Sequence, residues 1–345
     1  MSVSVHGTNG LTFNDGSVQK TSALTGFRNR IINGDMRIDQ RNAGSAISVT
    51  TPSQATTFVV DRMNVFANGT GTFSAQRSTT APDGFTNSIV ITVTTADTSI
   101  TTTDHYAIRQ RLEGYNISDL CLGTLSAKPF TISFWARSSI VGTYSVGITN
   151  FNGTGTDKTY TSDYTINTAN TWEQKTINIP AVTSGSWGTG ANCGMELFFC
   201  LAAGSSYTGT PNVWASSPNY YIGSINNTTS LIGTNGATFY ITGVQLEAGS
   251  TATEFERRPY GTELALCQRY YWTGNLPIMR NFTGGTIAVS SSIGLPVTMR
   301  TTPSTVTIGS GTLETAYSSA ISAYSSGITS GQAYTPGVAT ASAEL

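Results

Sequence analysis

Short runs in which hydrophobic and polar residues alternate cover most of the chain. In the stretch FTISFWAR, the side chains of Phe130, Ile132, Phe134 and Ala136 fall on one face of an extended strand, because successive side chains of a strand point to opposite faces. Similar runs, bounded by Gly, Asn or Pro, occupy residues 57–67, 88–95, 143–151, 171–180, 195–203 and 237–248. Regularly spaced strands without helices between them predict an all-β protein whose main domain is a jelly-roll β-sandwich.

The run at residues 237–248 is the predicted last strand of this sandwich. We expect a single unbroken alternation along it, which places Phe239, Ile241, Gly243 and Gln245 on one face. The opposite face then carries Tyr240, Thr242, Val244 and Leu246.

A short helix is predicted at residues 262–272, after a connector that Pro259 and Gly261 punctuate. Thr262 is the expected N-cap and Glu263 lies in the first turn, where a carboxylate is favoured. The expected apolar face comprises Leu264, Leu266, Cys267, Tyr270 and Tyr271. The helix would join the sandwich to a second β domain.

The C-terminal part of the chain is again strand-like. Residues 285–309 predict two strands with a proline-punctuated link, and residues 338–345 predict a final strand. Residues 313–334 are interpreted as loop or strand, with a short helix as the alternative. The predicted domains are residues 1–26, an attachment segment; residues 27–260, the jelly roll; and residues 261–345, a short helix with a smaller C-terminal β domain.

The first 26 residues contain two turn signals. Asn9-Gly10 and Asp15-Gly16 supply the positive φ angles that a tight hairpin needs. A hairpin of this size cannot bury its own face. It would therefore pack on a copy of itself or on a partner, or else form a disordered tail.

Composition narrows the possible partners. Only 11% of the 345 residues are charged and the net charge is −1, so the basic surplus that nucleic acid or an anionic membrane attracts is missing. No run approaches the about 18 apolar residues of a membrane span, and the N-terminus has no export signal, so we expect synthesis in a cytoplasm without membrane insertion. The cysteines lack metal-site spacing and are expected to be buried free thiols: Cys121, Cys193, Cys200 and Cys267.

Residues for catalysis are sparse. Of the two histidines, His6 lies in the N-terminal segment and His105 follows Asp104. In a Ser-His-Asp triad the aspartate lies across the site from the serine, so a direct sequence neighbour such as Asp104 is a poor partner for His105. We expect a solvated or strand-edge His105. A glycosidase needs two facing carboxylates, and the strand candidates, expected to be solvated, are Asp157, Asp163, Glu173 and Glu196. The sequence predicts neither an enzyme nor a cofactor.

Aromatic residues gather in one loop-rich region. Candidates for glycan binding, set among Gly, Ser and Asn, are Trp187, Tyr207, Trp214, Tyr220 and Tyr221. Exposed rings offer apolar faces to the C–H side of a sugar, and neighbouring amides and hydroxyls supply hydrogen bonds. Alternatively these rings close the end of the sandwich or lie in a subunit interface, because large aromatic side chains are mostly buried.

A long motif suggests a family. Residues 243–271, with residues 29–44 and 106–114, resemble a pattern common in structural proteins of tailed bacteriophages, particularly tail-fibre and receptor-binding proteins. Residues 10–23 resemble a short motif at the N-termini and joints of such fibres. The expected residues of the domain junction, or of the same junction between subunits, are Glu254, Glu256, Arg257, Arg258 and Tyr260.

The large domain is also similar to the carbohydrate-binding jelly rolls attached to many glycanases. The likeness includes the opening residues 33–35, the strand at 130–137 and the closing strand. In such modules an acidic residue near the opening and another in the closing strand often hold a structural calcium. Asp35 matches the first, but Tyr240 and Thr242 stand where the second is expected, so we assign no calcium.

These resemblances imply a non-enzymatic virion protein, a tail fibre or receptor-binding protein that assembles as a homotrimer. It would join other virion proteins through its N-terminus and contact a host cell-surface glycan. Alternatives are a capsid decoration or cement protein, a glycan depolymerase and a free carbohydrate-binding module.

Overall fold

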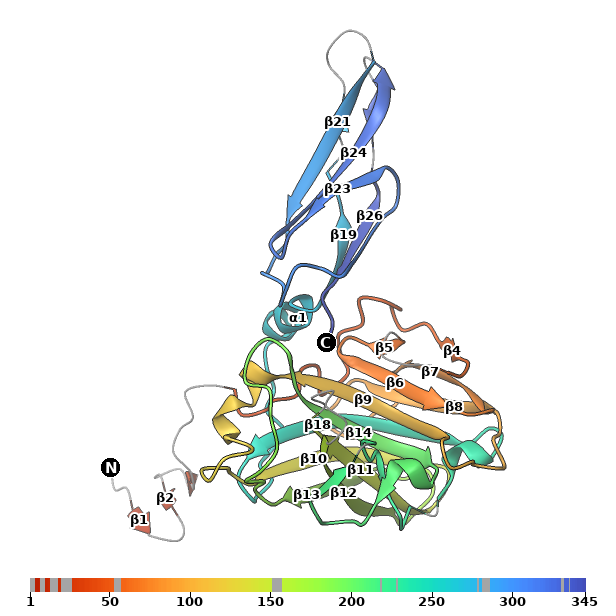
Figure 1. The fold of residues 1–345 in the computed structure, drawn as a ribbon, viewed down its shortest axis with the longest axis vertical. Coiled ribbons are helices and arrows are strands. Elements are labelled where there is room, and N and C mark those ends of the chain that lie inside the picture. Colours follow the sequence, from red (N-terminus) through yellow and green to blue (C-terminus); the bar gives the residue numbers. More distant parts are fainter. Residues whose placement is uncertain are drawn as a thin grey trace.

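The computed structural model describes residues 4–6, 10–12, 18–19, 27–52, 57–150, 157–217, 219–227, 229–277, 279–280, 286–329, 332–334 and 336–345. They form a two-sheet β-sandwich from which a slender β arm projects (Figure 1). The all-β prediction is confirmed.

Two antiparallel sheets build the sandwich. The first, in spatial order, contains β13 (Glu173–Ile179), β10 (Phe130–Ser138), β18 (Thr238–Ala248), β8 (Ser88–Thr95), β7 (Thr72–Ser78) and β4 (Ile47–Val49). The second contains β16 (Ala215–Ser217), β12 (Asp157–Ile166), β11 (Gly142–Thr149), β14 (Cys193–Ala203), β9 (His105–Glu113), β6 (Met63–Asn68) and β5 (Phe58–Val60). Strands distant in sequence lie side by side in both sheets, as in a jelly roll.

The core lies between the sheets. Phe130, Ile132, Phe134 and Ala136 of β10 are fully buried, which confirms the alternation predicted for this strand. Phe134 meets Phe199 of the opposite sheet edge to face, with ring centroids 5.0 Å apart, an arrangement that aromatic pairs prefer.

Strand β18 departs from a single alternation. Its pairing with β10 shifts between Ser133 and Trp135, and Gly243 there has φ 62°. The bulge inserts one extra residue, which reverses the phase of the strand, so Val244 and Leu246 enter the core. The prediction that Gly243 and Gln245 share a face with Phe239 is therefore wrong.

Residues 57–67, interpreted as one strand, form a hairpin. Strands β5 and β6 are antiparallel and turn at Asp61 and Arg62, where Arg62 has φ 69°. Both side chains at this turn are buried. Packing against neighbouring segments therefore stabilises the hairpin in addition to its own backbone hydrogen bonds.

Helix α1 (Tyr260–Gln268) begins and ends earlier than predicted. Pro259 precedes it and no side chain caps it, so the Thr262 N-cap is wrong. Just after the helix, the backbone N–H of Tyr270 donates a hydrogen bond to the Cys267 carbonyl. The chain then extends as β19 (Tyr271–Asn275). Cys267 and Tyr270 pack on Ile32 and Ile38 of the sandwich.

The arm, residues 271–342, consists of small antiparallel sheets. One contains β19, β26 (Val338–Ser342) and β22 (Thr305–Ile308); another contains β21 (Thr286–Gly294), β24 (Ala320–Thr329) and β23 (Thr312–Ala316); and β20 (Met279–Arg280) pairs with β25 (Ala333–Tyr334). The predicted final strand is confirmed, and residues 313–334 are mainly strand where they are described. The arm's small core is Trp272, Leu276, Met299, Ile321, Ala323, Ala339 and Ala341, with Ala343 beyond it.

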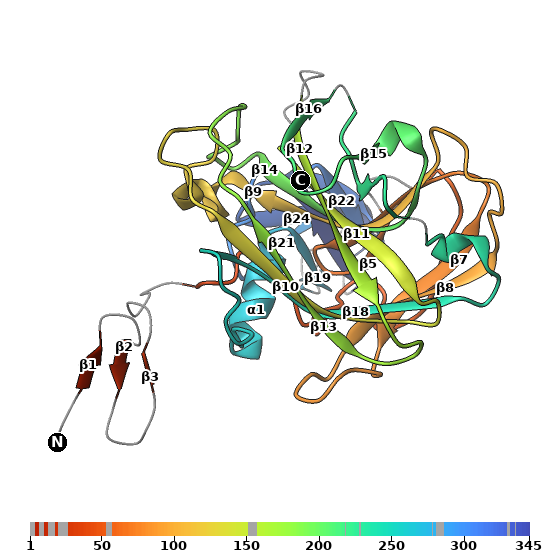
Figure 2. The same ribbon diagram turned by 90° about the horizontal axis from the view of Figure 1, so that it is seen from below.

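Short elements complete the fold. Three antiparallel strands near the N-terminus, β1 (Ser4–His6), β2 (Gly10–Thr12) and β3 (Val18–Gln19), lie side by side (Figure 2). The remaining elements are η1 (Gly114–Asn116), η2 (Ser118–Leu120), η3 (Ser205–Tyr207), β15 (Thr208–Gly209), β17 (Gly223–Ser224) and η4 (Leu231–Gly233). Among the described residues, no helix is both long and apolar enough to cross a bilayer.

Candidate functional site

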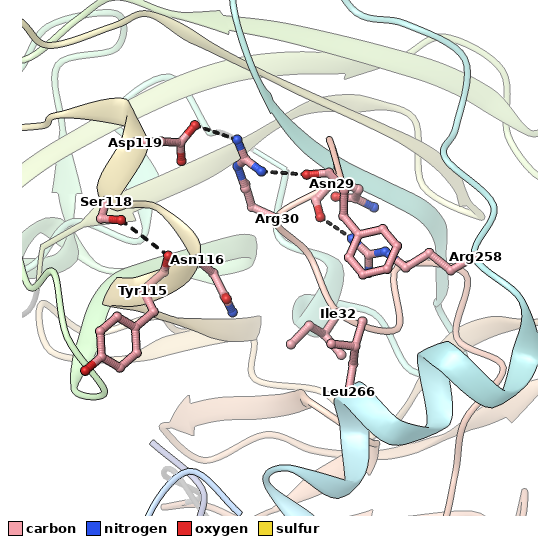
Figure 3. A pocket seen from close by; sticks show the side chains of 10 residues that line it. Asn29, Arg30, Ile32, Tyr115, Asn116, Ser118, Asp119, Arg258 and Leu266 are labelled. Atoms are coloured by element: carbon pink, nitrogen blue, oxygen red, sulfur yellow. Dashed lines mark hydrogen bonds and ion pairs between the residues drawn. The ribbon is translucent and has the colours of Figure 1, made fainter. Parts of the chain in front are cut away.

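A pocket of about 260 Å³ opens where η1 and η2 face the start of the sandwich domain and helix α1 (Figure 3). Ile32 and Leu266 supply apolar lining. Tyr115 and Phe27 also line the pocket and are 63% and 47% exposed. The Tyr115 ring extends away from Arg30, Ile32 and Leu266 (Figure 3), and the Arg258 guanidinium lies over the Phe27 ring at 4.7 Å.

Polar groups complete the lining. Arg30 donates through Nη2 to Asp119 Oδ2 at 2.6 Å, and through Nη1 to the Phe27 carbonyl at 2.6 Å. Asn116 and Ser118 extend the polar edge. The lining thus combines a small apolar surface with a carboxylate, an amide, a hydroxyl and a guanidinium, groups that can bond to a polar ligand.

A second pocket, of about 460 Å³, is also lined by residues of the η1–η2 turn. Ser118 lines both pockets. Ile117, Leu122 and Trp187 supply apolar surface to the second one, so the η1–η2 turn contributes to two concave surfaces.

The five aromatic candidates separate into different environments. Trp187 is 9% exposed and meets Trp214 edge to face, with centroids 5.7 Å apart. Trp214 donates its indole N–H to the Pro180 carbonyl at 2.9 Å. These two rings pack against the edge of the sandwich, and Trp187 also lines the second pocket.

Tyr207 and Tyr220 lie on the outer face of the seven-stranded sheet. They pack with Phe66 and Phe198, and the Tyr220 ring stacks on Phe198 with an interplanar angle of 3°. Burial raises the pKa of Tyr220 to about 12. Tyr221 is half-buried beside Gly209, so the structure does not bring the five rings into one site.

The five junction candidates differ in how deeply their side chains are buried. Arg258 is buried, pairs with Glu263 at 3.3 Å and with Glu256 at 3.5 Å, and donates to the carbonyls of Asn29 and Ile31. Glu256 also accepts hydrogen bonds from the backbone N–H groups of Arg28 and Asn29 at 3.0 Å each.

The other three junction candidates lie at the surface. Arg257 covers the Phe85 ring at 4.6 Å. The Glu254 carbonyl accepts a hydrogen bond from Gln245 at 3.3 Å. Tyr260 is 56% exposed at the first residue of α1.

A group that the sequence did not reveal fixes the arm to the sandwich. Buried Glu113 accepts hydrogen bonds from Arg269 at 2.6 and 3.1 Å and from the Tyr270 hydroxyl at 2.6 Å. Glu344, just past β26, pairs with Arg41 at 2.9 Å and with Arg62. Because these partners lie 156 to 303 residues apart, no local pattern could have indicated them.

The candidate catalytic residues occupy structural positions. Glu196 is fully buried and pairs with Arg109 at 3.1 Å and with Arg111, and Asp157 is also buried, so the expectation of solvated carboxylates is wrong for both. Asp163 and Glu173 are half-buried. Burial opposes ionisation of Glu173, but hydrogen bonds from Lys175, Thr168 and Asn167 lower its pKa to about 2.

His105, expected to be solvated or at a strand edge, is buried at the start of β9. It begins β9 and stacks on Phe66 with ring centroids 4.3 Å apart. Burial lowers the pKa of its imidazole, which favours the neutral form. A role as an exposed acid or base is therefore poorly supported.

Asp35 forms an ion pair with Arg37. Among the residues that the structure describes, no three His, Cys, Asp or Glu side chains gather in a way that could hold a metal ion. The cysteines are free thiols; Cys200 and Cys267 are buried as predicted, whereas Cys121 and Cys193 are partly exposed.

No protein-family model and no curated protein matches the chain. Similar solved structures include the enzymatically active domain of tailspike protein 4 of bacteriophage CBA120, at 12% identity and a TM-score of 0.31, with 55% of this chain and 19% of the tailspike chain covered. A putative sugar binding protein from Bacteroides thetaiotaomicron matches at 14% identity and a TM-score of 0.38, with 64% and 100% covered. A family 11 carbohydrate-binding module from Clostridium thermocellum matches at 13% identity and a TM-score of 0.30, with 61% and 99% covered. Scores in this range do not identify a family or a ligand.

Proposed function

We propose that the chain is a non-enzymatic structural protein of a tailed-bacteriophage particle, a tail fibre or receptor-binding protein. It assembles as a homotrimer, joins the virion through its N-terminal segment and contacts a glycan on the host surface. The motif at residues 243–271 motivates the phage assignment, and the low charge of the arm is the observation that carries the assembly.

The arm lacks the charges of an ordinary solvated surface. Between residues 286 and 342 the only charged residues are Arg300 and Glu314. Arg300 is bound at the base of the arm, where it donates to the carbonyls of Ala343, Ala191 and Glu344 at 2.8 to 3.0 Å. The outer β21–β24–β23 sheet therefore carries a single formal charge.

This sheet also leaves hydrophobic groups uncovered. Tyr324 is 37% exposed and faces Ser290 and Thr312 across the ladder, while Leu313, which is 41% exposed, pairs with Ala323 on the other face of the sheet. Depletion of charge around exposed aromatic side chains is typical of the centre of a protein interface. The face of the sheet that carries Ile321 and Ala323 is covered by the arm's own core, and two further copies of the chain are the proposed cover of the opposite face, which carries Tyr324.

The Glu196 ion pairs support a non-enzymatic role. A carboxylate held by two arginines on the sheet face is neutralised in the resting protein.

Native mass spectrometry of the purified full chain tests the assembly. We expect three times the chain mass for the wild type and monomer for Tyr324→Arg, because an unpaired charge would then be buried in the interface. Val141, which is 50% exposed on the sandwich, gives the matched control Val141→Arg, which should stay trimeric. A monomeric wild type, or a trimeric Tyr324→Arg variant, would contradict the proposed arm interface.

A further inference from the structure

A third pocket, of about 440 Å³, lies on the side of the sandwich that carries β4 and β7 (Figure 1). The ladder between these two strands stops at the Ile47–Ala75 pair, and the residues before β4 form a turn instead of continuing it. Residues 43–45, at the end of this turn, line one wall, and residues 76–79 with Asn87 line the rest. The pocket therefore opens between the turn and the end of β7.

The turn beside this pocket is held by its own hydrogen bonds. Both carboxylate oxygens of Asp39 accept backbone N–H groups, one from Asn42 at 2.9 Å and one from Gly44 at 2.6 Å. Ala43 and Gly44 have φ angles of 50° and 86°, so the backbone curves through the left-handed region, which glycine adopts readily. This wall of the pocket is therefore in place before any ligand binds.

Arg77 is the one charged residue among the described residues that line the pocket. It is half-buried and donates through Nη1 to the Arg37 carbonyl at 2.8 Å. Nε and Nη2 face the turn, since a Cβ atom placed on Gly44 would lie 3.9 and 3.6 Å from them. Among the residues that the structure describes, this guanidinium forms no ion pair and no second hydrogen bond. Its Nε–Nη2 edge is therefore left for a ligand.

The rest of the lining is polar and uncharged. It contains no carboxylate that would compensate the charge of Arg77. Amide and hydroxyl groups both donate and accept hydrogen bonds, so they match the hydroxyl groups of a sugar. These groups belong to Ser45, Gln76, Ser78, Thr79 and Asn87.

The free edge of Arg77 selects the charged part of the ligand. A guanidinium binds a carboxylate through two parallel charge-assisted hydrogen bonds, and Nε and Nη2 supply the two donors. One guanidinium balances the single charge of a carboxylate, whereas a phosphate monoester carries about −1.5 to −2 at pH 7 and would need a further cation. The volume of about 440 Å³ lies within the range of about 300–1,000 Å³ typical of small-molecule sites, so it accommodates a sugar ring together with its carboxylate.

We propose that this pocket binds an acidic sugar residue of a glycan, with Nε and Nη2 of Arg77 donating to the two carboxylate oxygens. The amides of Gln76 and Asn87 and the hydroxyls of the lining bond to the sugar hydroxyls. A stacking ring is not needed, because the paired hydrogen bonds orient the ligand. The assignment rests on the glycan contact proposed above and names its place and its ligand class.

Saturation-transfer NMR and calorimetry on the full chain test the ligand class. The probes are the methyl glycosides of glucuronic, galacturonic and N-acetylneuraminic acid, the neutral methyl glucoside and methyl galactoside, and a glucose phosphate monoester. We expect at least one carboxylated glycoside to bind at least tenfold more tightly than the neutral glycosides and the phosphate. Preference for a neutral glycoside or for the phosphate, or no binding of any carboxylated glycoside, would overturn the proposal.

Two variants locate the binding. Arg77→Lys keeps the positive charge but loses the paired N–H groups, so it should weaken binding at least tenfold. Gln76→Glu adds a carboxylate to the lining and should weaken binding by a similar factor through repulsion. The Gln76 side chain forms no hydrogen bond among the described residues, so this variant decides the matter where Arg77→Lys lowers the melting temperature. Wild-type affinity in either folded variant would refute the site.

Arg137 provides the matched control. It lies on β10 of the same six-stranded sheet, donates to the Asn170 carbonyl at 2.8 Å and, among the residues described, forms no ion pair. Arg137→Lys should therefore bind the acidic sugar like the wild type. A loss of affinity as large as that of Arg77→Lys would contradict the assignment, because the effect would then not be specific to the pocket.

Adsorption of the labelled trimer to host cells separates this proposal from the broader one. Wild-type adsorption that Arg77→Lys does not reduce would leave attachment intact and overturn the pocket assignment. Absence of wild-type adsorption would instead contradict the attachment function.

Discussion

Replacing Arg258 by Ala should destabilise the sandwich strongly, whereas the same change at Arg257 should not. Arg258 is 6% exposed and holds Glu263, Glu256 and the carbonyls of Asn29 and Ile31. Alanine would leave the Glu263 carboxylate, itself 4% exposed, without its partner. These groups connect the start of the domain to α1, so the loss reaches the whole junction.

The magnitude follows from burial. Removing one partner of a buried ion pair costs about 3–5 kcal/mol of unfolding free energy. For a domain of this size, each kcal/mol lowers the melting temperature by about 2–4 °C, so we expect a loss of about 10 °C. Arg257 is exposed and covers the Phe85 ring, a contact worth about 0.5–1 kcal/mol at a surface.

Differential scanning calorimetry on the two variants measures the contrast. Arg258→Met, which keeps much of the side-chain volume, should lose nearly as much stability as Arg258→Ala, since the lost charge dominates. Equal small shifts for Arg257→Ala and Arg258→Ala would refute the reasoning, because the buried pairs would then contribute nothing.

Three further predictions concern the base of the arm, the hairpin turn and the N-terminus. Glu344→Ala should leave Arg62 and Arg41 without their carboxylate, cost about 3 kcal/mol and increase amide hydrogen exchange in β19 and β26; unchanged exchange would count against this clamp. Burial raises the pKa of Asp61 to about 6, above its unfolded value of about 3.9, so the native state holds the proton more tightly and stability should fall as pH rises through this range. Urea titrations should show wild type losing about 1–2 kcal/mol relative to Asp61→Asn between pH 5 and pH 8, and a parallel pH dependence of the two proteins would argue against the buried carboxyl. Deletion of residues 1–26 should leave a folded trimer that no longer joins the particle, which native mass spectrometry and particle assembly assays check; loss of folding would exclude a separate attachment segment.

Local patterns predicted the strands well where the chain is regular. Strand β10 keeps its alternation from Phe130 to Ala136 because nothing interrupts its pleat. Strand β18 breaks its alternation at Gly243. The bulge there moves the following side chains to the opposite face, and the residue types along the strand do not change to indicate it. The helix prediction shifted because tertiary pairing of Tyr271 with Ser342 extended the chain beyond Gln268.

The candidate site was less accessible to sequence reasoning. Its lining comes from residues 27–32, 115–119, 258 and 266, which only the folded sheets bring together. Tyr115 lies in a polar turn between two strands, and this signal could have selected it. The aromatic stretch at 187–221 attracted attention by density, but density does not distinguish packed rings from exposed ones.

Cryo-electron microscopy of the particle that encodes this chain tests the central claim most directly. The account predicts three copies around a local three-fold axis in a fibre on the tail, with their arms in contact through the β21–β24–β23 sheets. Density for the chain across the capsid lattice would contradict the attachment function and identify a decoration protein instead.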